Sequence, residues 1–155
     1  MDVAKLFAVI AVLGTAVVYG TDVFCAMVQR PALARIDDRA LLAVMGSIHR
    51  YGDQRMPVPG VIGMVAAAIS AAFAAVSGRW MQAAAAGVAL GVLLVWLVVY
   101  LRVSKPINRQ LIAGAGNPSL PTDAGALQRS WDSVIIMRAT LQGLAVATLC
   151  AAILI

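Results

Sequence analysis

Residues 80–101 read WMQAAAAGVALGVLLVWLVVYL, a stretch without a single charged side chain. A helix needs about 20 mostly apolar residues to cross the hydrocarbon core of a bilayer, so this stretch predicts a transmembrane helix. Three other apolar runs of similar length lie at residues 3–28, 58–76 and 134–155. The sequence therefore predicts an all-α integral membrane protein in which residues 1–155 form one four-helix bundle.

The composition agrees with a membrane protein and excludes several kinds of metal enzyme. Hydrophobic residues make up 62% of the chain and charged residues 12%, against about 45–50% and 25% in soluble domains. The acidic residues are all aspartates, and His49 is the only histidine. Di-iron carboxylate sites, facial-triad iron sites and histidine-rich zinc or copper clusters need more histidines or glutamates than this. We expect no metal site.

The connections between the four runs differ in length. Residues 77–79 are a tight connection, so the second and third runs form an antiparallel hairpin. Residues 32–54 carry apolar side chains at helical spacing, which predicts a partly helical, amphipathic segment whose apolar face lies on the membrane surface. That face comprises Leu33, Ile36, Leu41, Leu42, Val44, Met45 and Ile48. In the third connection, Thr122 or Asp123 is expected to cap a helix that continues through Arg138.

The basic residues predict the orientation. The first and third connections lie on one side and carry ten Lys and Arg side chains with Arg138 included, whereas the other side has only Lys5 and Arg79. By the positive-inside rule both termini face outward and both long connections face the cytoplasm, which makes the chain a multi-pass protein of the cell (inner) membrane. Orientation explains the positive net charge, so no nucleic acid partner is needed.

Asp22 lies within the first apolar run, where an ionised carboxylate is expensive. Thr15, Tyr19 and Asp22 share one helix face with Ala26 and Gln29. In the fourth run, Trp131, Ile135, Arg138 and Gln142 share a face, as do Trp96, Tyr100 and Ser104 in the third. These faces meet at similar depth, so we expect Asp22 to pair with Arg138. The pair is either a structural tie between two spans or part of a site with Tyr19, Tyr100, Trp131, Asn108 and His49.

His49 allows several interpretations. A lone histidine among arginines is most often a surface residue with ordinary hydrogen bonds. Imidazole also titrates near neutrality, so His49 is a candidate proton-handling group. One histidine suffices for five-coordinate haem, so a haem-binding redox protein with His49 as axial ligand stays open as an alternative.

Three short patterns make the chain resemble the anthrone-oxygenase-like family, which consists of small four-helix membrane proteins, most of unknown function. They are YG with a following RP at the end of the first run, KPIN after the third, and a Trp and an Arg seven positions apart in the fourth. The matched positions are Tyr19, Gly20, Arg30, Pro31, Pro106, Asn108, Trp131 and Arg138. Ile135 stands where many members have a histidine.

The resemblance implies an oxidoreductase that converts a hydrophobic aromatic substrate, such as an anthrone, with molecular oxygen. Such a reaction needs a base, donors for a developing oxyanion and a flat slot. Asp22 and His49 are the candidate bases, and Arg138 and Asn108 the candidate oxyanion donors. Tyr19, Trp96, Tyr100, Trp131 and Gln142 are the candidate substrate-binding residues. Such a mechanism needs no metal.

Two non-catalytic classes stay open beside the enzyme and the haem protein. A small transporter would need a charge near the bilayer midplane, and Asp22 is near one end. An assembly subunit would use the Ala- and Gly-rich faces of the second and third runs, which allow close helix contact. The same faces serve an internal bundle and a homo-oligomer equally well.

Overall fold

The computed structural model describes residues 2–117 and 122–155, and its regular secondary structure is helical throughout these ranges. Four continuous helical stretches make up the fold: residues 3–33, 38–76, 80–116 and 124–154. Their segments are α1 (Val3–Phe24), η1 (Cys25–Gln29), α2 (Arg30–Leu33), α3 (Asp38–Arg55), α4 (Pro57–Val76), α5 (Trp80–Val99), η2 (Tyr100–Ser104), α6 (Lys105–Gly116) and α7 (Ala124–Leu154), where η marks a π-helical turn.

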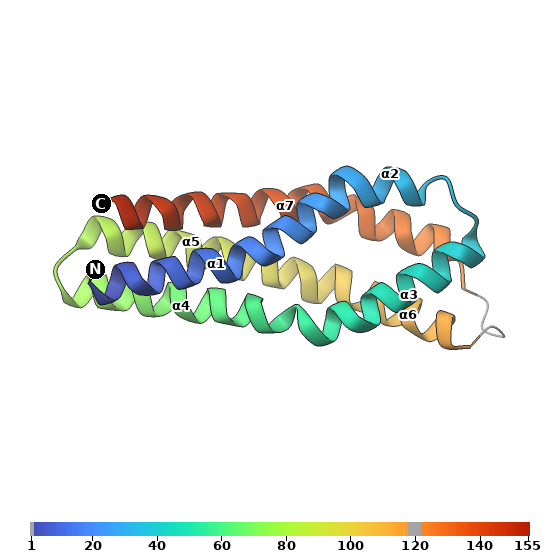
Figure 1. The fold of residues 1–155 in the computed structure, drawn as a ribbon, viewed down its shortest axis with the longest axis horizontal. Helices are drawn as coiled ribbons and strands as arrows, with labels where there is room; N and C mark the ends of the chain where they lie inside the picture. Colours follow the sequence, from blue (N-terminus) through green and yellow to red (C-terminus); the bar gives the residue numbers. More distant parts are fainter. Residues whose placement is uncertain (1, 118–121) are drawn as a thin grey trace.

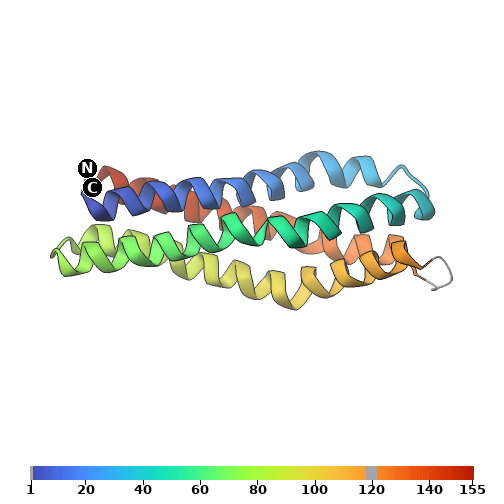
Figure 2. The same ribbon diagram turned by 60° about the horizontal axis from the view of Figure 1, so that its bottom comes forward.

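The four stretches lie side by side as an elongated bundle. Both termini and the connection between α4 and α5 lie at one end, which we call the near end, while α2, α3 and α6 lie toward the other, the far end (Figures 1 and 2). Each stretch is long and apolar enough to span a membrane, with lengths of 31, 39, 37 and 31 residues. Since about 20 residues suffice to cross a bilayer core, each helix extends well beyond the length that a membrane requires.

Two separate cores hold the bundle together. Toward the near end, small side chains of α1, α4, α5 and α7 pack closely: Ala11, Ala66, Ala67, Ala89, Leu93, Ala145 and Leu149. Toward the far end, larger side chains join η1, α2, α3, α6 and α7: Cys25, Leu33, Leu41, Met45, Ile107, Leu111, Ala124, Trp131 and Ile135. The cavity described below shares Cys25 and Trp131 with the far core.

The connections are more ordered than the sequence predicts. The first contains α3, a complete helix, and the third begins with α6, which continues α5. Leu41 and Met45 pack in the core with α6 instead of lying on a membrane surface, whereas Val44 and Ile48 are exposed. The predicted apolar face is therefore divided between a protein partner and the outside of the bundle.

Local sequence signals define the helix ends. The Asp123 carboxylate accepts a hydrogen bond from the Ala126 amide at 2.7 Å, which confirms the predicted cap of α7. Asp37 caps α3 in the same way, and the amide groups of Ala40 and Arg39 hold the pKa of its carboxyl below the usual value. Because this pKa is lowered by folding, the cap stabilises α3 at neutral pH and loses that effect as the pH falls through the folded-state pKa.

Close contact between α1 and α4 depends on Gly14 of α1, which faces Gly63 of α4. A Cβ added at Gly14 would lie 2.7 Å from the Pro59 carbonyl oxygen and 2.8 Å from the Gly63 amide nitrogen. A Cβ added at Gly91, on the exposed side of α5, would meet nothing within 4 Å. Gly14 thus lets two backbones approach closely, whereas Gly91 does not.

Gly14→Ala is expected to lower the free energy of unfolding by about 1–3 kcal/mol because the added methyl group overpacks the contact. The matched variant Gly91→Ala is expected to raise it by roughly 0.5–1 kcal/mol through helix propensity alone. Reversible unfolding in mixed micelles, followed by circular dichroism, measures both. Equal effects of the two substitutions would show that the α1–α4 contact is not as tight as described.

Candidate functional site

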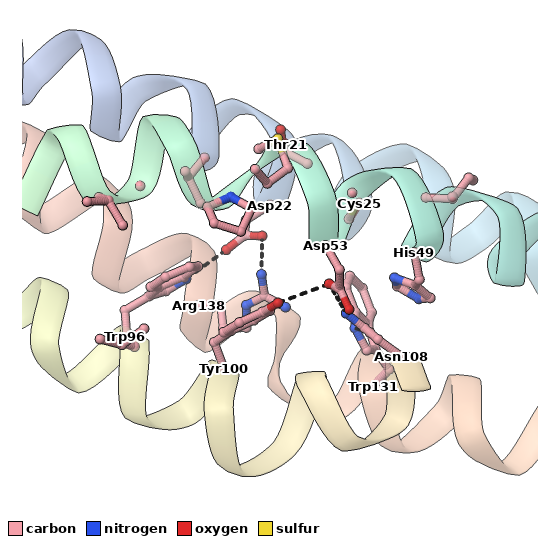
Figure 3. Close-up of a pocket in the computed structure, with 18 of the residues that line it drawn as sticks. Thr21, Asp22, Cys25, His49, Asp53, Trp96, Tyr100, Asn108, Trp131 and Arg138 are labelled. Atoms are coloured by element: carbon pink, nitrogen blue, oxygen red, sulfur yellow. Dashed lines mark hydrogen bonds and ion pairs between the residues drawn. The ribbon is translucent and has the colours of Figure 1, made fainter. Parts of the chain in front are cut away.

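A cavity of about 170 Å³ is lined by residues of α1 and η1, of the junction of α3 and α4, and of α5, η2, α6 and α7 (Figure 3). Its apolar wall includes Val18, Ile48, Met56, Val61, Met64 and Leu97. Its polar residues are Thr21, Asp22, Gln29, His49, Asp53, Tyr100, Asn108 and Arg138, with Trp96 and Trp131 beside them. A dry protein cavity of about 150 Å³ holds benzene, so this space suits a small aromatic molecule.

The predicted pairing of Asp22 with Arg138 is confirmed. The two side chains form an ion pair in which Arg138 Nη2 lies 2.7 Å from Asp22 Oδ1. The Arg138 side chain is 7% exposed and that of Asp22 is 3% exposed. The second carboxylate oxygen of Asp22 accepts a hydrogen bond from Trp96 Nε1 at 3.0 Å, and Arg138 Nη1 donates to Ser104 Oγ at 2.9 Å. Both oxygens of Asp22 are therefore engaged, which makes this carboxylate a poor candidate for a base.

Three aromatic rings surround the Arg138 guanidinium. Its Cζ atom lies 5.3 Å from the ring centroid of Trp131, 5.5 Å from that of Trp96 and 5.8 Å from that of Tyr100. Trp96 and Tyr100 stack on each other with centroids 5.6 Å apart. Since cations are attracted to the faces of aromatic rings, these side chains hold the positive charge in a fixed position.

Asp53 belongs to the site although the sequence analysis did not single it out. Its Oδ1 atom accepts hydrogen bonds from Tyr100 Oη at 2.9 Å and from Asn108 Nδ2 at 2.8 Å. Asn108 Oδ1 in turn accepts from Trp131 Nε1 at 3.1 Å. Asn108 thus has its oxygen and one of its two Nδ2–H groups committed to Trp131 and Asp53, which fixes the amide and leaves one N–H as a donor.

His49 is buried at the cavity beside Trp131. The two ring centroids are 5.6 Å apart and the planes are tilted by 50°. His49 Nε2 is buried and has no hydrogen-bond partner among the described residues. His49 and Asp53 are four positions apart on α3, so they occupy the same face of that helix (Figure 3). The interpretation of His49 as an ordinary surface residue is therefore wrong.

Two π-helical turns lie at the cavity, and each precedes a proline. η1 ends at Gln29 before Pro31, and η2 ends at Ser104 before Pro106. A proline inside a helix lacks an amide donor and clashes with the carbonyl four residues earlier, so the preceding turn widens. Such turns occur often at functional sites. Here they carry Cys25 and Tyr100, which both line the cavity.

Two of the expected substrate-binding residues do not line the cavity. The Tyr19 ring lies against α7, where a Cβ added at Gly143 would be 3.1 Å from it. Gln142 is buried one turn beyond Arg138, and its Oε1 has no partner among the described residues. The residues of α1 and η1 that reach the cavity are instead Val18, Thr21, Asp22, Cys25 and Gln29, because the helix is rotated from the orientation that the sequence pattern indicated.

The residues do not fit a haem group. His49 has an unpartnered nitrogen, which an axial ligand requires, but the indole of Trp131 packs beside its ring. A cavity of about 170 Å³ is also far too small for a porphyrin unless the helices move apart. Within the described residues no group of three or more His, Cys, Asp or Glu side chains lies together in an arrangement that suits a metal ion.

Comparisons with known proteins found no match. No protein-family model, no curated protein and no solved structure matches this chain.

Proposed function

We propose that this chain is a multi-pass membrane protein and that its cavity binds and oxidises a flat, hydrophobic aromatic molecule. Membrane insertion is supported by the surface of the bundle, where large apolar side chains point outward from all four helices, among them Leu13, Val17, Val61, Val65, Leu94, Val98 and Leu144. Soluble monomers rarely expose continuous apolar surface of this extent. The basic side chains of the far end favour a cytoplasmic location for α3 and α6, with both termini outside, in the inner membrane.

Labelling of single cysteines tests this orientation. In a background with Cys25→Ser and Cys150→Ser, Ser77→Cys introduces a thiol at the exposed near end and Ala34→Cys introduces one at the exposed far end. A membrane-impermeant maleimide is expected to label Ser77→Cys in intact cells and Ala34→Cys only after lysis. The reverse pattern would contradict the proposed orientation.

One observation carries the proposed reaction. A buried imidazole nitrogen without a partner lines the same cavity as the Arg138 guanidinium, which three aromatic rings and Asp22 hold in place. A free imidazole nitrogen is suited to accept a proton, and a fixed cation is suited to stabilise an anion that forms nearby. His49 is thus the base of the proposal, and Arg138 stabilises the anion.

The substrate class that fits these roles is an aromatic molecule with an acidic C–H bond, such as an anthrone. An anthrone has three fused rings and is larger than benzene, so part of it extends through the open side of the cavity. His49 removes a proton from the doubly benzylic CH₂ carbon, and the resulting oxyanion lies beside Arg138. One electron passes from this anion to O₂, and the two radicals combine through a new C–O bond. The peroxide anion then takes up the proton to give a hydroperoxide.

A second deprotonation at the same carbon completes the reaction. The C–H electron pair forms the C=O bond, the O–O bond breaks, and the leaving hydroxide takes up a proton to become water. Anthrone and O₂ thus give anthraquinone and water, with O₂ accepting all four electrons. The resemblance to the anthrone-oxygenase-like family supports the same reaction, although the base is His49 on α3 rather than a residue of α7.

Oxygen uptake with anthrone tests the proposal. Purified protein in detergent is expected to consume one O₂ per anthraquinone formed, at a rate that rises in proportion to protein concentration above the micelle blank. Its absorption spectrum is expected to contain no Soret band. A rate equal to that of protein-free micelles would refute the enzymatic function, and a Soret band would refute the assignment of His49 as a free base.

A further inference from the structure

Asp53 has one carboxylate oxygen without a partner. Both of its hydrogen bonds, from Tyr100 and Asn108, go to Oδ1. No hydrogen bond to Oδ2 and no ion pair of Asp53 occurs among the described residues. A carboxylate accepts about four hydrogen bonds when fully satisfied, so Oδ2 is able to accept hydrogen bonds from a ligand. Asp53 is partly buried and lines the cavity.

Four nitrogen atoms near Asp53 donate to other partners. Trp96 Nε1 and Arg138 Nη2 donate to Asp22, Arg138 Nη1 donates to Ser104, and Trp131 Nε1 donates to Asn108. Among the described residues at the cavity, Arg138 Nε is a buried donor without a partner, His49 Nε2 is a buried ring nitrogen without a partner, and Asp53 Oδ2 is an acceptor without one. A carboxylate oxygen only accepts hydrogen bonds, so a ligand that pairs with Oδ2 must supply the donor.

Asp53 shares one wall of the cavity with His49. His49 and Asp53 are separated by one helical turn on α3, which places their Cβ atoms about 6 Å apart. Asp22 and apolar residues of α1 also line the cavity. A ligand that satisfies the α3 wall therefore needs an O–H donor at the edge of a ring that otherwise contacts apolar side chains.

We infer that Asp53 is the specificity-determining residue of the cavity and that it selects aromatic ligands with a ring hydroxyl group, through a hydrogen bond from that hydroxyl to Oδ2. This inference rests on the proposed function, because it takes the same cavity as the ligand site. It adds that a ring hydroxyl strengthens binding, so that a hydroxylated anthrone is a tighter ligand than anthrone itself, because only the hydroxylated molecule donates to the partly buried Oδ2.

Two matched probes test the inference by binding alone. 2-Naphthol and 2-methoxynaphthalene have the same ring system, and only the first donates a hydrogen bond. Isothermal titration calorimetry with protein in nanodiscs measures both affinities, and protein-free nanodiscs give the partition of each probe into lipid. After this correction, the wild-type protein is expected to bind 2-naphthol about 10- to 100-fold more tightly than the ether, as a hydrogen bond to a charged acceptor implies.

Variants assign the preference to Asp53. Asp53→Asn keeps an oxygen that accepts from Tyr100 and Asn108 but replaces Oδ2 by an amide donor, so the affinity ratio is expected to fall to about one. Asp132→Asn is the matched control because Asp132 is partly buried on α7 and does not line the cavity. This control is expected to keep the wild-type ratio.

The outcomes separate this inference from the proposed function. Equal corrected affinities of the two probes in the wild-type protein would refute the role of Asp53, whether or not Asp53→Asn folds, and would leave the cavity as an apolar ligand site. An unchanged ratio in folded Asp53→Asn would also refute it. If neither probe binds, both the inference and the ligand site of the proposed function are wrong.

Discussion

Replacement of Arg138 by methionine is expected to lower the free energy of unfolding by about 3–5 kcal/mol. The substitution leaves the Asp22 carboxylate inside the bundle with only Trp96 as a donor. Burial of a charge without a partner costs far more than the loss of the pair itself, because the carboxylate has already given up its water. Reversible unfolding in mixed micelles, followed by circular dichroism, gives the change.

Two further variants show whether the loss comes from the stranded charge. Asp22→Leu combined with Arg138→Met removes both charges and is expected to recover more than half of the lost stability. Arg79→Met breaks the exposed pair with Asp2 at the near end, where the side chains are 32% and 40% exposed. Such surface pairs contribute at most about 1 kcal/mol. If Arg138→Met cost no more than Arg79→Met, the buried pair would have no special role in the fold.

The same double variant separates stability from chemistry. It is expected to fold but to oxidise anthrone no faster than the micelle blank, because it has no fixed cation beside the developing oxyanion. Recovery of both stability and the wild-type rate would mean that Arg138 serves only to hold α1 and α7 together.

His49→Ala is expected to lower the rate of anthrone oxidation by about 10²- to 10⁴-fold, the usual contribution of a general base. The variant loses no hydrogen bond of His49 Nε2, but removal of the buried ring leaves a space beside Trp131, so circular dichroism is used to verify that it is folded. The initial rate of anthraquinone formation, measured by absorbance, gives the effect. Asp132→Asn, outside the cavity, serves as the control and is expected to keep the wild-type rate.

Imidazole added to His49→Ala distinguishes a base from a residue that only shapes the cavity. The truncated side chain leaves space for free imidazole, which is expected to restore part of the rate in a concentration-dependent way. A wild-type rate in the unsupplemented variant would eliminate His49 as the base. A low rate that imidazole does not raise would assign His49 a packing role against Trp131.

The Asp22–Arg138 pair shows what the sequence is able to predict. Both are charged residues within apolar runs, and both lie near the end of their run that faces the long connections. The two side chains are therefore expected at a similar depth in the membrane. Helical spacing then limits which faces meet, and a buried carboxylate needs a cation. Three independent constraints thus agree on one partner, and the structure contains that ion pair.

Asp53 shows where such constraints end. It lies in a polar stretch that the sequence analysis treated as a membrane-surface segment, so nothing assigned it a depth. The available signal was its position four residues after His49 on what is a continuous helix leading into α4. Helical periodicity of residues 38–55 would have placed both side chains on one face, but not against η2 and α6, because that contact depends on how α3 packs.

The sequence pattern also did not predict how the helices continue past the cavity. Pro31 and Pro106 indicate helix ends when considered alone, yet each helix continues through a widened turn. Tyr19 was assigned to the wrong face because a helical face inferred from spacing has no fixed rotation until its neighbours are known. Its ring contacts α7 near Gly143 while Val18 and Cys25 reach the cavity.

Tryptophan fluorescence tests most directly whether the cavity is a ligand site. The chain has three tryptophans, and Trp80 lies exposed near the opposite end, so Trp80→Phe leaves Trp96 and Trp131 at the cavity as the only emitters. Anthrone added to this variant without oxygen is expected to quench the emission along a saturable curve that 2-naphthol shifts by competition. Quenching that rises linearly with anthrone, as it does for free tryptophan analogues in the same micelles, would contradict the assignment of this cavity as the functional site.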